Sequence, residues 1–460
     1  MIEVETLETS SLGDRSYLAT DGEVAVVIDP QRDIDRVLQL AQQRGVRISH
    51  VLETHIHNDY VSGGLELARC TGASYVLAAG SRVSFDHLAV ADGDVLSVGE
   101  MRLRAVHTPG HTHHHLSYVL ERADGEAVAV FTGGSMLYGA TGRTDLVSPE
   151  DTVELSHDQY HSVQRLAREL PAGTQVFPTH GFGSFCSATP TSGTSSTVGE
   201  QRKVNPALTL AEQEYVDTLL AGLDAYPAYY VHMAPINRQG PAPVDLSPSG
   251  LVDPAELRRR IADGEWVVDL RERTAFAAGH LADSLNFELG DNLVTYLGWL
   301  YRWGAPLTVI GQTEEQILTA RRELVRIGID ELAGAAVGTI EALADGAPLR
   351  SYRVSDFAGL AEAMARGPVR VLDARRNDER ARGGVRGSQH IPLHELAQRL
   401  EEVPAGEVWV YCGSGYRASI AASVLDRRGH QVVLVNDFYS NAAGAGLEDR
   451  TAETAGPPTT

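Results

Sequence analysis

The chain of 460 residues has little lysine and no long hydrophobic run. Lys203 is its only lysine, and the formal net charge is -22. So acidic a surface repels phosphate backbones and anionic lipid, which argues against nucleic acid or a membrane surface as a partner. No apolar run approaches the roughly 20 residues that cross a bilayer, and the first residues lack the apolar segment of a secretory signal. We therefore expect a cytoplasmic protein that acts on a small molecule.

Cysteine is equally scarce. The three cysteines, Cys70, Cys186 and Cys412, lie far apart, and an odd number argues against a disulfide scaffold. A reducing compartment with reactive thiols is the better expectation. Hydrophobic residues make up 43% and charged residues 22% of the chain, as in folded globular proteins. Its length predicts about two to four domains.

The order of strand-like and helix-like segments predicts an α/β protein of several domains. Up to about residue 185, short apolar runs alternate with Gly-rich turns. The Pro- and Gly-rich stretch "APINRQGPAPVDLSPSG" is typical of a linker. Two similar segments follow, "EWVVDLRERTAFAAGHLADSLNF" and "VRVLDARRNDERARGGVRGSQHIPL", each succeeded by a strand and a helix, which favours parallel sheets wrapped by helices. The predicted domains are 1–240, 251–345 and 350–447.

Histidines stand at the ends of the predicted strands in the first domain. The segment "THIHNDY" places His55 and His57 on one turn, whereas "TPGHT" and "PTHG" place His111 and His180 on two others. A His-x-His pair can aim two imidazoles at one cation, and neutral imidazole suits zinc and iron alike. The pattern predicts a metal site.

The segments "VIDP", "THIHNDY", "TPGHT", "FTGGS" and "PTHG" resemble, in this order, the five motifs of the metallo-beta-lactamase fold. The resemblance implies an αββα sandwich with metal at the sheet ends. Tyr60 stands where the superfamily has a histidine that binds a second metal. The resemblance to the persulfide dioxygenase branch therefore implies a single iron, Fe(II), with zinc as the alternative. The segment "GATGRTDL" is similar to the same branch and implies that Arg143 binds substrate.

One departure affects the metal site itself. The fourth motif of the family normally reads Thr-Gly-Asp, and Gly134 replaces the metal-binding aspartate. Three outcomes are open: a third histidine completes the site, a water or an anion fills the space, or the domain binds no metal. We predict the first. The expected ligands are His55, His57 and His111, with Asp59 and His180 as their hydrogen-bond partners or as remnants of a second metal site.

A second candidate site lies in "VWVYCGSGYRASIAASVL", where a strand runs directly into a helix with Cys412 at the junction. Backbone N–H groups, the helix N-terminus and Arg417 favour a thiolate there. The segment resembles the active-site loop of rhodaneses, in which the cysteine carries a persulfide, and its six-residue length matches sulfurtransferases. The resemblance implies a catalytic pair, Cys412 and Arg417, and a cradle for thiosulfate or a thiol persulfide made by Gly413, Ser414, Gly415 and Tyr416.

The counterpart segment in the first copy, "TVIGQTEEQILTA", has no cysteine and two glutamates. Thiolate chemistry is impossible there, and acidic residues repel an anionic substrate. We therefore predict that residues 251–345 form a rhodanese-like domain without catalytic activity.

The domain order is similar to that of the fused persulfide dioxygenases and sulfurtransferases of bacterial sulfide detoxification. This similarity implies oxidation of a low-molecular-weight persulfide to sulfite at a mononuclear iron, coupled to sulfur transfer through Cys412. Cys186, close behind His180, is a candidate sulfur relay. The alternatives are a sulfurtransferase with a degenerate metal site, a glyoxalase II-like thioester hydrolase, and a persulfide-binding sensor or carrier. The physiological thiol, the direction of sulfur flow and a homo-oligomeric state are open at this level.

Overall fold

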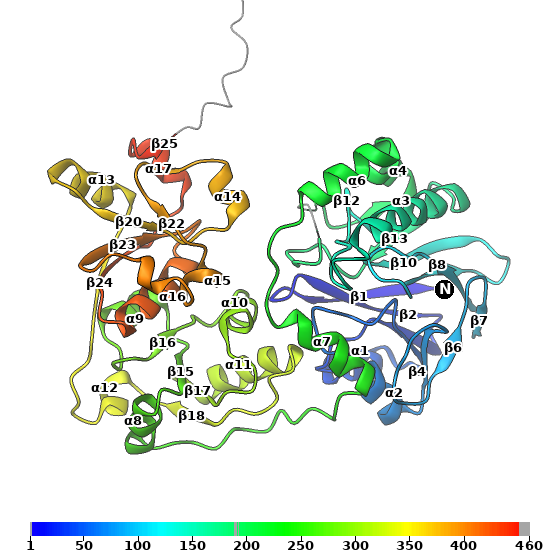
Figure 1. Ribbon diagram of the computed structural model, residues 1–460. Helices are drawn as coiled ribbons and strands as arrows, with labels where there is room; N and C mark the ends of the chain where they lie inside the picture. Colours follow the sequence, from blue (N-terminus) through cyan, green and yellow to red (C-terminus); the bar gives the residue numbers. More distant parts are fainter. Residues whose placement is uncertain (1, 188–190, 192, 450–460) are drawn as a thin grey trace, which may run out of the picture. The chain divides into compact units, whose positions relative to one another are not determined.

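The computed structural model describes residues 2–187, 191 and 193–449. The chain divides into two compact units (Figure 1). The first comprises Met1–Asp245 with Arg322–Asp330, and the second comprises Leu246–Arg321 with the described part of Glu331–Thr460. Within the described residues, no helix combines the length and the apolar character that crossing a bilayer needs.

The first unit contains two six-stranded sheets. One has the order β1-β2-β3-β4-β5-β6 and the other the order β14-β13-β10-β9-β8-β7. The strands of the first sheet are β1 (Glu3–Thr9), β2 (Asp14–Thr20), β3 (Val24–Ile28), β4 (Arg47–Leu52), β5 (Ser74–Ala78) and β6 (Leu88–Val90). Those of the second are β7 (Val95–Val98), β8 (Met101–His107), β9 (Leu116–Glu121), β10 (Ala127–Gly133), β13 (Gln175–Pro178) and β14 (Ser196–Thr197).

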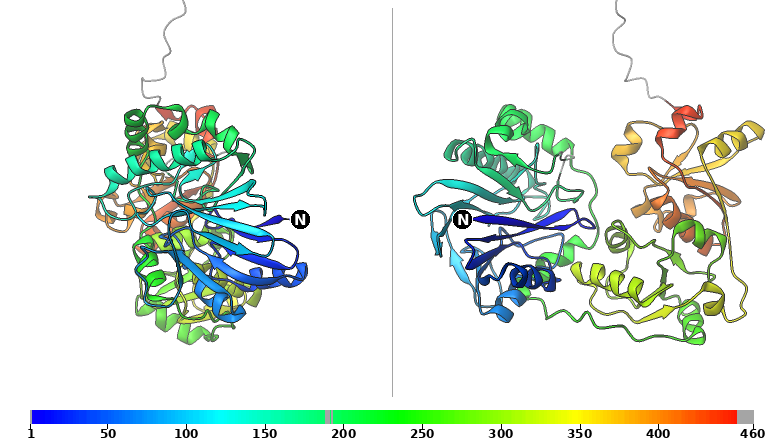
Figure 2. Two further views of the ribbon diagram at one scale, coloured as in Figure 1. Left: turned by 90° about the vertical axis from the view of Figure 1, so that its right-hand side faces the viewer. Right: turned by 180° about the vertical axis from the view of Figure 1, so that it is seen from behind.

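The two sheets pack face to face, and helices cover their outer faces (Figure 2). Tyr17 of β2 meets Phe131 of β10 with ring centroids 5.5 Å apart in the core between the sheets. On the first sheet pack α1 (Asp35–Arg44) and α2 (Gly64–Thr71), and on the second pack α3 (Thr152–Glu169) and α6 (Glu212–Ala221). Burial of apolar side chains on both faces of each sheet stabilises this arrangement. The predicted αββα sandwich is confirmed.

The remaining helices of the first unit follow the second sheet in sequence. They are α4 (Val198–Val204), α5 (Pro206–Thr209) and α7 (Tyr230–Gln239), and a short hairpin joins β11 (Met136–Leu137) to β12 (Ala140–Thr141). Thr197 caps α4 through a capping box with Glu200, which satisfies backbone N–H groups at the helix start. The Ser/Thr-rich stretch before α4 lies partly outside the described residues.

The second unit contains two parallel sheets. The four-stranded sheet has the order β16-β15-β17-β18, and the five-stranded sheet has the order β19-β24-β23-β20-β22. The first is made of β15 (Trp266–Asp269), β16 (Leu285–Asn286), β17 (Leu307–Gly311) and β18 (Gly334–Val337). The second is made of β19 (Arg353–Ser355), β20 (Arg370–Asp373), β22 (Gln389–His390), β23 (Glu407–Tyr411) and β24 (Gln431–Val435). The predicted α/β character with parallel sheets is therefore confirmed.

Helices flank these sheets as the alternating pattern predicts. They include α8 (Pro254–Ala262), α9 (Arg273–Ala278), α10 (Leu293–Leu300), α11 (Glu314–Arg326), α12 (Ile340–Ala344), α13 (Phe357–Arg366), α14 (Asn377–Ala381), α15 (Leu393–Leu396), α16 (Tyr416–Arg427) and α17 (Ser440–Gly444). Each predicted rhodanese-like segment encloses one of the two sheets, although both sheets belong to one compact unit. The division of the chain into three domains stays a prediction.

The two copies share a buried aspartate–arginine pair at the end of a strand. Asp269, at the end of β15, accepts from Arg271 at 2.7 Å, and Asp373, at the end of β20, accepts from Arg375 at 2.7 Å. Each arginine also donates to a backbone carbonyl eight residues further on. Such charge-assisted bonds fix the turn that follows the strand. The copies thus keep the same scaffold, whereas only one of them carries a cysteine.

Candidate metal centre and cysteine loop

The four strand-end histidines of the first unit lie together and are fully or almost fully buried. His55 and His57 follow β4, His111 follows β8, and His180 follows β13. The ring centroid of His55 lies 4.1 Å from that of His57, 4.8 Å from that of His111 and 5.3 Å from that of His180. The carboxyl ends of strands from both sheets meet at this edge, which is why residues 125 positions apart become neighbours.

Three of the imidazoles are oriented by hydrogen bonds on their Nδ1 side. His111 Nδ1 donates to the carbonyl of Arg143 at 2.7 Å, and His180 Nδ1 donates to Asp14 Oδ1 at 2.9 Å. His55 Nδ1 lies 2.9 Å from the hydroxyl of Thr54, which itself donates to a carboxylate. Bonds of this kind fix the tautomer in which Nε2 is free to bind a cation.

Two of the Nε2 atoms are spaced as ligands of one metal ion are, and a third has no hydrogen-bond partner. His55 Nε2 lies 3.4 Å from His180 Nε2. Two nitrogens held about 2.0–2.1 Å from one ion at the tetrahedral angle lie roughly 3.3 Å apart. His111 Nε2 is buried and has no hydrogen-bond partner among the described residues. Burial and the neighbouring histidines hold the pKa of His55 well below its usual range and lower that of His111 to about 3. At neutral pH both rings are therefore unprotonated and free to bind a cation.

His57 differs from the other three. Its Nε2 lies 3.3 Å from Asp29 Oδ1 and 3.2 Å from Glu53 Oε2, and the hydroxyl of Tyr60 is 2.9 Å away. Although burial alone would lower it, Asp29 and Glu53 raise the pKa of His57 to about 9. The Nε2 atom of His57 thus faces acidic groups, whereas its Nδ1 atom is buried without a hydrogen-bond partner among the described residues and is free to bind a cation. Tyr60, which replaces the superfamily's last histidine, stacks on this ring with centroids 4.3 Å apart.

The position of the missing carboxylate is filled by a histidine ring. A Cβ atom at Gly134 would lie 2.2 Å from Cδ2 of His111, and one at Gly142 would lie 2.8 Å from its Nδ1. The imidazole of His111 thus lies between two glycines and occupies space that a side chain at position 134 would need. The absence of Cβ at Gly134 is required by this packing.

Sequence reasoning missed Asp14 and gave His180 only an outer role. His180 belongs both to a possible ligand group with His55 and His57 and to a second one with His111 and Cys186. Asp14 and Asp59 flank His180 and hold its pKa well above its usual value although burial opposes this. Asp14 opens β2 without any motif, so only the tertiary structure places it here. His180 is more central than its predicted role as an outer partner.

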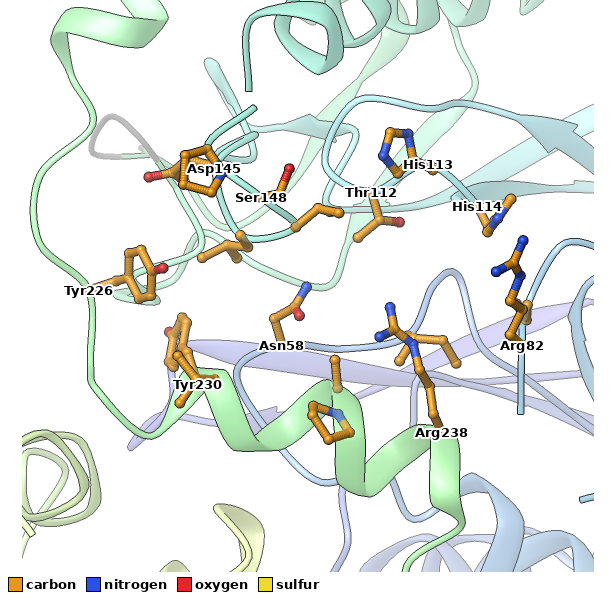
Figure 3. A pocket seen from close by; sticks show the side chains of 18 residues that line it. Asn58, Arg82, Thr112, His113, His114, Asp145, Ser148, Tyr226, Tyr230 and Arg238 are labelled. Atoms are coloured by element: carbon orange, nitrogen blue, oxygen red, sulfur yellow. The ribbon is translucent and has the colours of Figure 1, made fainter. Parts of the chain in front are cut away.

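A cavity of about 750 Å³ is lined by Ile56, Asn58 and Thr112, which are sequence neighbours of the metal-site histidines. Figure 3 shows Asn58 in its middle, Tyr226 and Tyr230 at one end, and Arg82 and Arg238 at the other. Asp145, the acidic residue of the lining, is paired with Arg143 at 2.6 Å. The cavity therefore has an aromatic end and a cationic end in an otherwise acidic protein. No motif marks the tyrosines and arginines at the two ends, which come from loops and from α7.

Arg143, a predicted substrate-binding residue, serves the scaffold in the structure. Its guanidinium donates to Asp145 and to the carbonyls of Phe185 and Asp224, and only 3% of the residue is exposed. Its own carbonyl orients His111. Arg143 does not appear among the described residues that line the cavity.

In the second unit, Cys412 joins β23 to α16 and is almost fully buried. The backbone N–H of Gly415 donates to its Sγ at 3.2 Å, as expected for a loop that curls around the sulfur. Gly415 has φ +92°, and a Cβ atom there would lie 2.2 Å from Oδ1 of Asn436. Glycine is therefore required at this position for both conformation and space.

The predicted anion-binding residues of this loop already have partners. Arg417 donates through both terminal nitrogens to the carboxylate of Glu379 on α14. Although burial opposes it, Arg417 lowers the pKa of Glu379 to about 2. The hydroxyl of Tyr416 donates to the carbonyl of Glu288 at 2.9 Å. An anionic substrate would have to compete with Glu379 for Arg417.

The first copy covers the cysteine loop. A cavity of only about 10 Å³ lies beside Arg417 and is lined in part by Tyr296 and Trp299 of α10 and by His394. Trp299 and His394 stack with ring centroids 4.9 Å apart. The segment that lacks a cysteine therefore contributes walls to the site of the copy that has one.

Comparisons with known proteins agree with this geometry. Residues 15–180 match the model of the metallo-beta-lactamase superfamily, and residues 357–444 match that of the rhodanese-like domain. The mitochondrial persulfide dioxygenase ETHE1 of Homo sapiens is 32% identical over 210 residues, which are 45% of this chain and 74% of that protein. A hydroxyacylglutathione hydrolase of Methylococcus capsulatus is 37% identical over 146 residues, 31% of this chain and 52% of that enzyme.

The solved structure of a metallo-beta-lactamase from Staphylococcus aureus has a TM-score of 0.66 and 25% identity, and covers 74% of this chain and 99% of that one. Both family models and the relatives' identity point to metal binding and sulfur metabolism. This enzyme of sulfur metabolism therefore belongs to the persulfide dioxygenase family of the metallo-beta-lactamase superfamily and carries a C-terminal rhodanese-like domain.

Proposed function

We propose that the first unit oxidises a low-molecular-weight thiol persulfide to sulfite and that Cys412 carries sulfane sulfur in the second unit. The first reaction is RSSH + O2 + H2O → RSH + HSO3− + H+, in which the sulfane sulfur loses the four electrons that O2 gains. The observation that carries this proposal is the buried histidine cluster, in which Nδ1 of His57 and Nε2 of His111 have no hydrogen-bond partner among the described residues, together with a cavity of about 750 Å³ that is lined by their sequence neighbours.

The residues present fit a metal ion, for which we propose Fe(II). His55, His57, His111 and His180 would supply its imidazole ligands, with His57 binding through its vacant Nδ1 while its Nε2 stays beside Asp29 and Glu53. When bound, the iron supplies the redox chemistry that O2 needs and a Lewis-acid position for the persulfide sulfur.

The chain itself orients the thiol. Asn58 and Thr112 line the cavity and are direct neighbours in sequence of His57 and His111. The sulfane end of the substrate would lie there, while Arg82 and Arg238 at the cationic end would bind its carboxylate groups. Tyr226 and Tyr230 would close the opposite end and exclude water. This arrangement suits an acidic thiol such as glutathione.

Sulfur transfer would proceed at Cys412. Its thiolate attacks the outer sulfur of thiosulfate, the S–S bond of the donor breaks, sulfite leaves with the electron pair, and Cys412 keeps the sulfur as a persulfide. A thiol or sulfite would then accept that sulfur from the Cys412 persulfide, which regenerates the thiolate. The N–H of Gly415 is placed to stabilise negative charge on Sγ.

The test is the iron content of anaerobically purified protein together with O2 consumption and sulfite release on adding glutathione persulfide. About one iron per chain with persulfide-dependent uptake is expected. Cys412→Ser is the matched control, since it removes transfer and leaves the histidines intact. Iron-loaded protein that consumes no O2 would contradict the proposal.

A second function is favoured by the packing at Gly134. Because His111 fills the place of the family's aspartate, a chain that binds no iron and acts only as a sulfurtransferase is the competing reading. It predicts transfer between thiosulfate and cyanide without any O2 uptake. Thioester hydrolysis is disfavoured, because Tyr60 and Gly134 stand at positions where a two-metal hydroxide site needs metal ligands.

A further inference from the structure

The histidine cluster lacks an anionic ligand where the family has one. Gly134 offers none, and the carboxylates of Asp29 and Glu53 face Nε2 of His57. Asp14 and Asp59 face the Nδ1 side of His180, so a cation bound by the imidazoles would still lack an anionic ligand in direct contact, which weakens binding in a buried place. Another anion within reach of the rings would restore the balance.

Cys186 is close enough to the rings to supply such an anion. Its Sγ, a ring nitrogen of His111 and a ring nitrogen of His180 all lie within 4.8 Å of one another. Cys186 and both histidines are fully buried. His111 Nε2 is an independent sign that a cation binds here, because it is a buried nitrogen without any partner among the described residues.

One residue positions both sides of this group. The backbone N–H of Arg143 donates to the carbonyl of Cys186 at 2.8 Å, while the carbonyl of Arg143 accepts from His111 Nδ1 at 2.7 Å. The Arg143 guanidinium also binds the carbonyl of Phe185, and the N–H of Cys186 donates to Ser184 Oγ at 3.2 Å. The thiol and the imidazole are thus fixed relative to each other by short, buried hydrogen bonds.

We propose that Cys186 binds the metal as a thiolate and, with His111 and His180, replaces the family's imidazole–carboxylate site by an imidazole–thiolate site. The inference rests on the proposed function only in assigning a metal to this cluster. On binding, the S–H bond breaks, the sulfur keeps the electron pair for the metal, and the proton passes to solvent water. Thiolate and imidazole together select Fe(II), Co(II) or Zn(II) over Mg(II) and Ca(II).

The absorption spectrum of bound Co(II) shows directly whether a thiolate is one of its ligands. Metal-free full-length protein is titrated with Co(II) under anaerobic conditions, and absorption in the near ultraviolet is followed, where a thiolate bound to Co(II) gives a charge-transfer band. We expect the band in the wild type, in Cys70→Ser and in Cys412→Ser. In Cys186→Ser the band disappears and the Co(II) affinity falls more than about tenfold.

Cys186→Asp separates the ligand role from a packing role. Because it returns a carboxylate, it should recover Co(II) binding without the charge-transfer band. Co(II) bound at one per chain by the wild type without that band, and equally well by Cys186→Ser, would overturn the inference and leave the metal assignment standing. No Co(II) binding by any of the proteins would overturn both.

Discussion

The metal centre and the cysteine loop differ in how they are built, and this explains how far each departs from its family. The centre draws its groups from β2, from the turns after β4, β8 and β13, and from the segment around Cys186. The loop takes its nucleophile and its glycine from one stretch of six residues. A site assembled from many segments can lose one ligand and refill the space with a neighbour, as His111 does at Gly134. A single curled loop allows no such exchange.

The largest effect is expected in the loop. Cys412→Ser should reduce thiosulfate sulfurtransferase activity by roughly 10³-fold or more, because the attacking sulfur is lost. The O2 uptake with glutathione persulfide should be unchanged. The two activities are measured on the same preparation. Transfer that persists in Cys412→Ser would place the sulfur carrier elsewhere in the chain.

The metal centre should respond in the opposite way. His111→Ala should lower both bound iron and persulfide-dependent O2 uptake by about 100-fold or more, since it removes the vacant Nε2. Thiosulfate transfer should stay at the wild-type level. His161→Ala, a change in a histidine whose side chain is 63% exposed, is the control. Equal loss of both activities would argue for unfolding instead.

Restoring the family's aspartate should not restore the family's site. In Gly134→Asp, the new Cβ would meet His111 at 2.2 Å, so the ring must move. We expect the unfolding free energy to fall by about 1–3 kcal/mol with no gain in iron. Gly134→Ala is the matched control, because it adds the same Cβ without the carboxylate. Iron content that rises in Gly134→Asp alone would show that the centre is weakened and not rebuilt.

The cationic end of the cavity should affect binding more than chemistry. Arg82→Ala and Arg238→Ala should each raise KM for glutathione persulfide about tenfold, because a charge-assisted hydrogen bond contributes about 1.4 kcal/mol, while kcat stays constant. Arg122→Ala, at an exposed pair with Glu126, should change neither constant. A lower kcat at unchanged KM would place the thiol in another orientation.

The smallest effect concerns Glu379. Its folded pKa of about 2 lies below the usual value of 4.5, so its pair with Arg417 stabilises the protein above pH 4.5 and loses this contribution as the pH falls towards 2. The stability difference between wild type and Glu379→Gln should therefore shrink over that window. At neutral pH the variant should bind thiosulfate several-fold more tightly, because Arg417 is released. Denaturant unfolding at several pH values and the KM for thiosulfate test both points.

The sequence predicted the fold from motif order. Its strand-end histidines predicted a metal centre, because strand ends of a sandwich meet at one edge, and they do lie together. The sequence alone could not show why His57 differs from His55. The two histidines are separated by a single residue, yet Asp29 and Glu53 raise the pKa of His57, whereas burial and the neighbouring histidines lower that of His55.

By itself, then, the sequence determined which side chains were available: the histidines, the cysteine loop with its glycines, and the absence of a carboxylate at Gly134. Only the tertiary structure decided what each one faces. It placed Cys186 beside His111 and His180, gathered Arg82 and Arg238 at one end of a cavity, and paired Arg417 with Glu379. The physical reason is that the charge and free nitrogen of a buried group depend on partners from distant segments, and no local spacing encodes those partners.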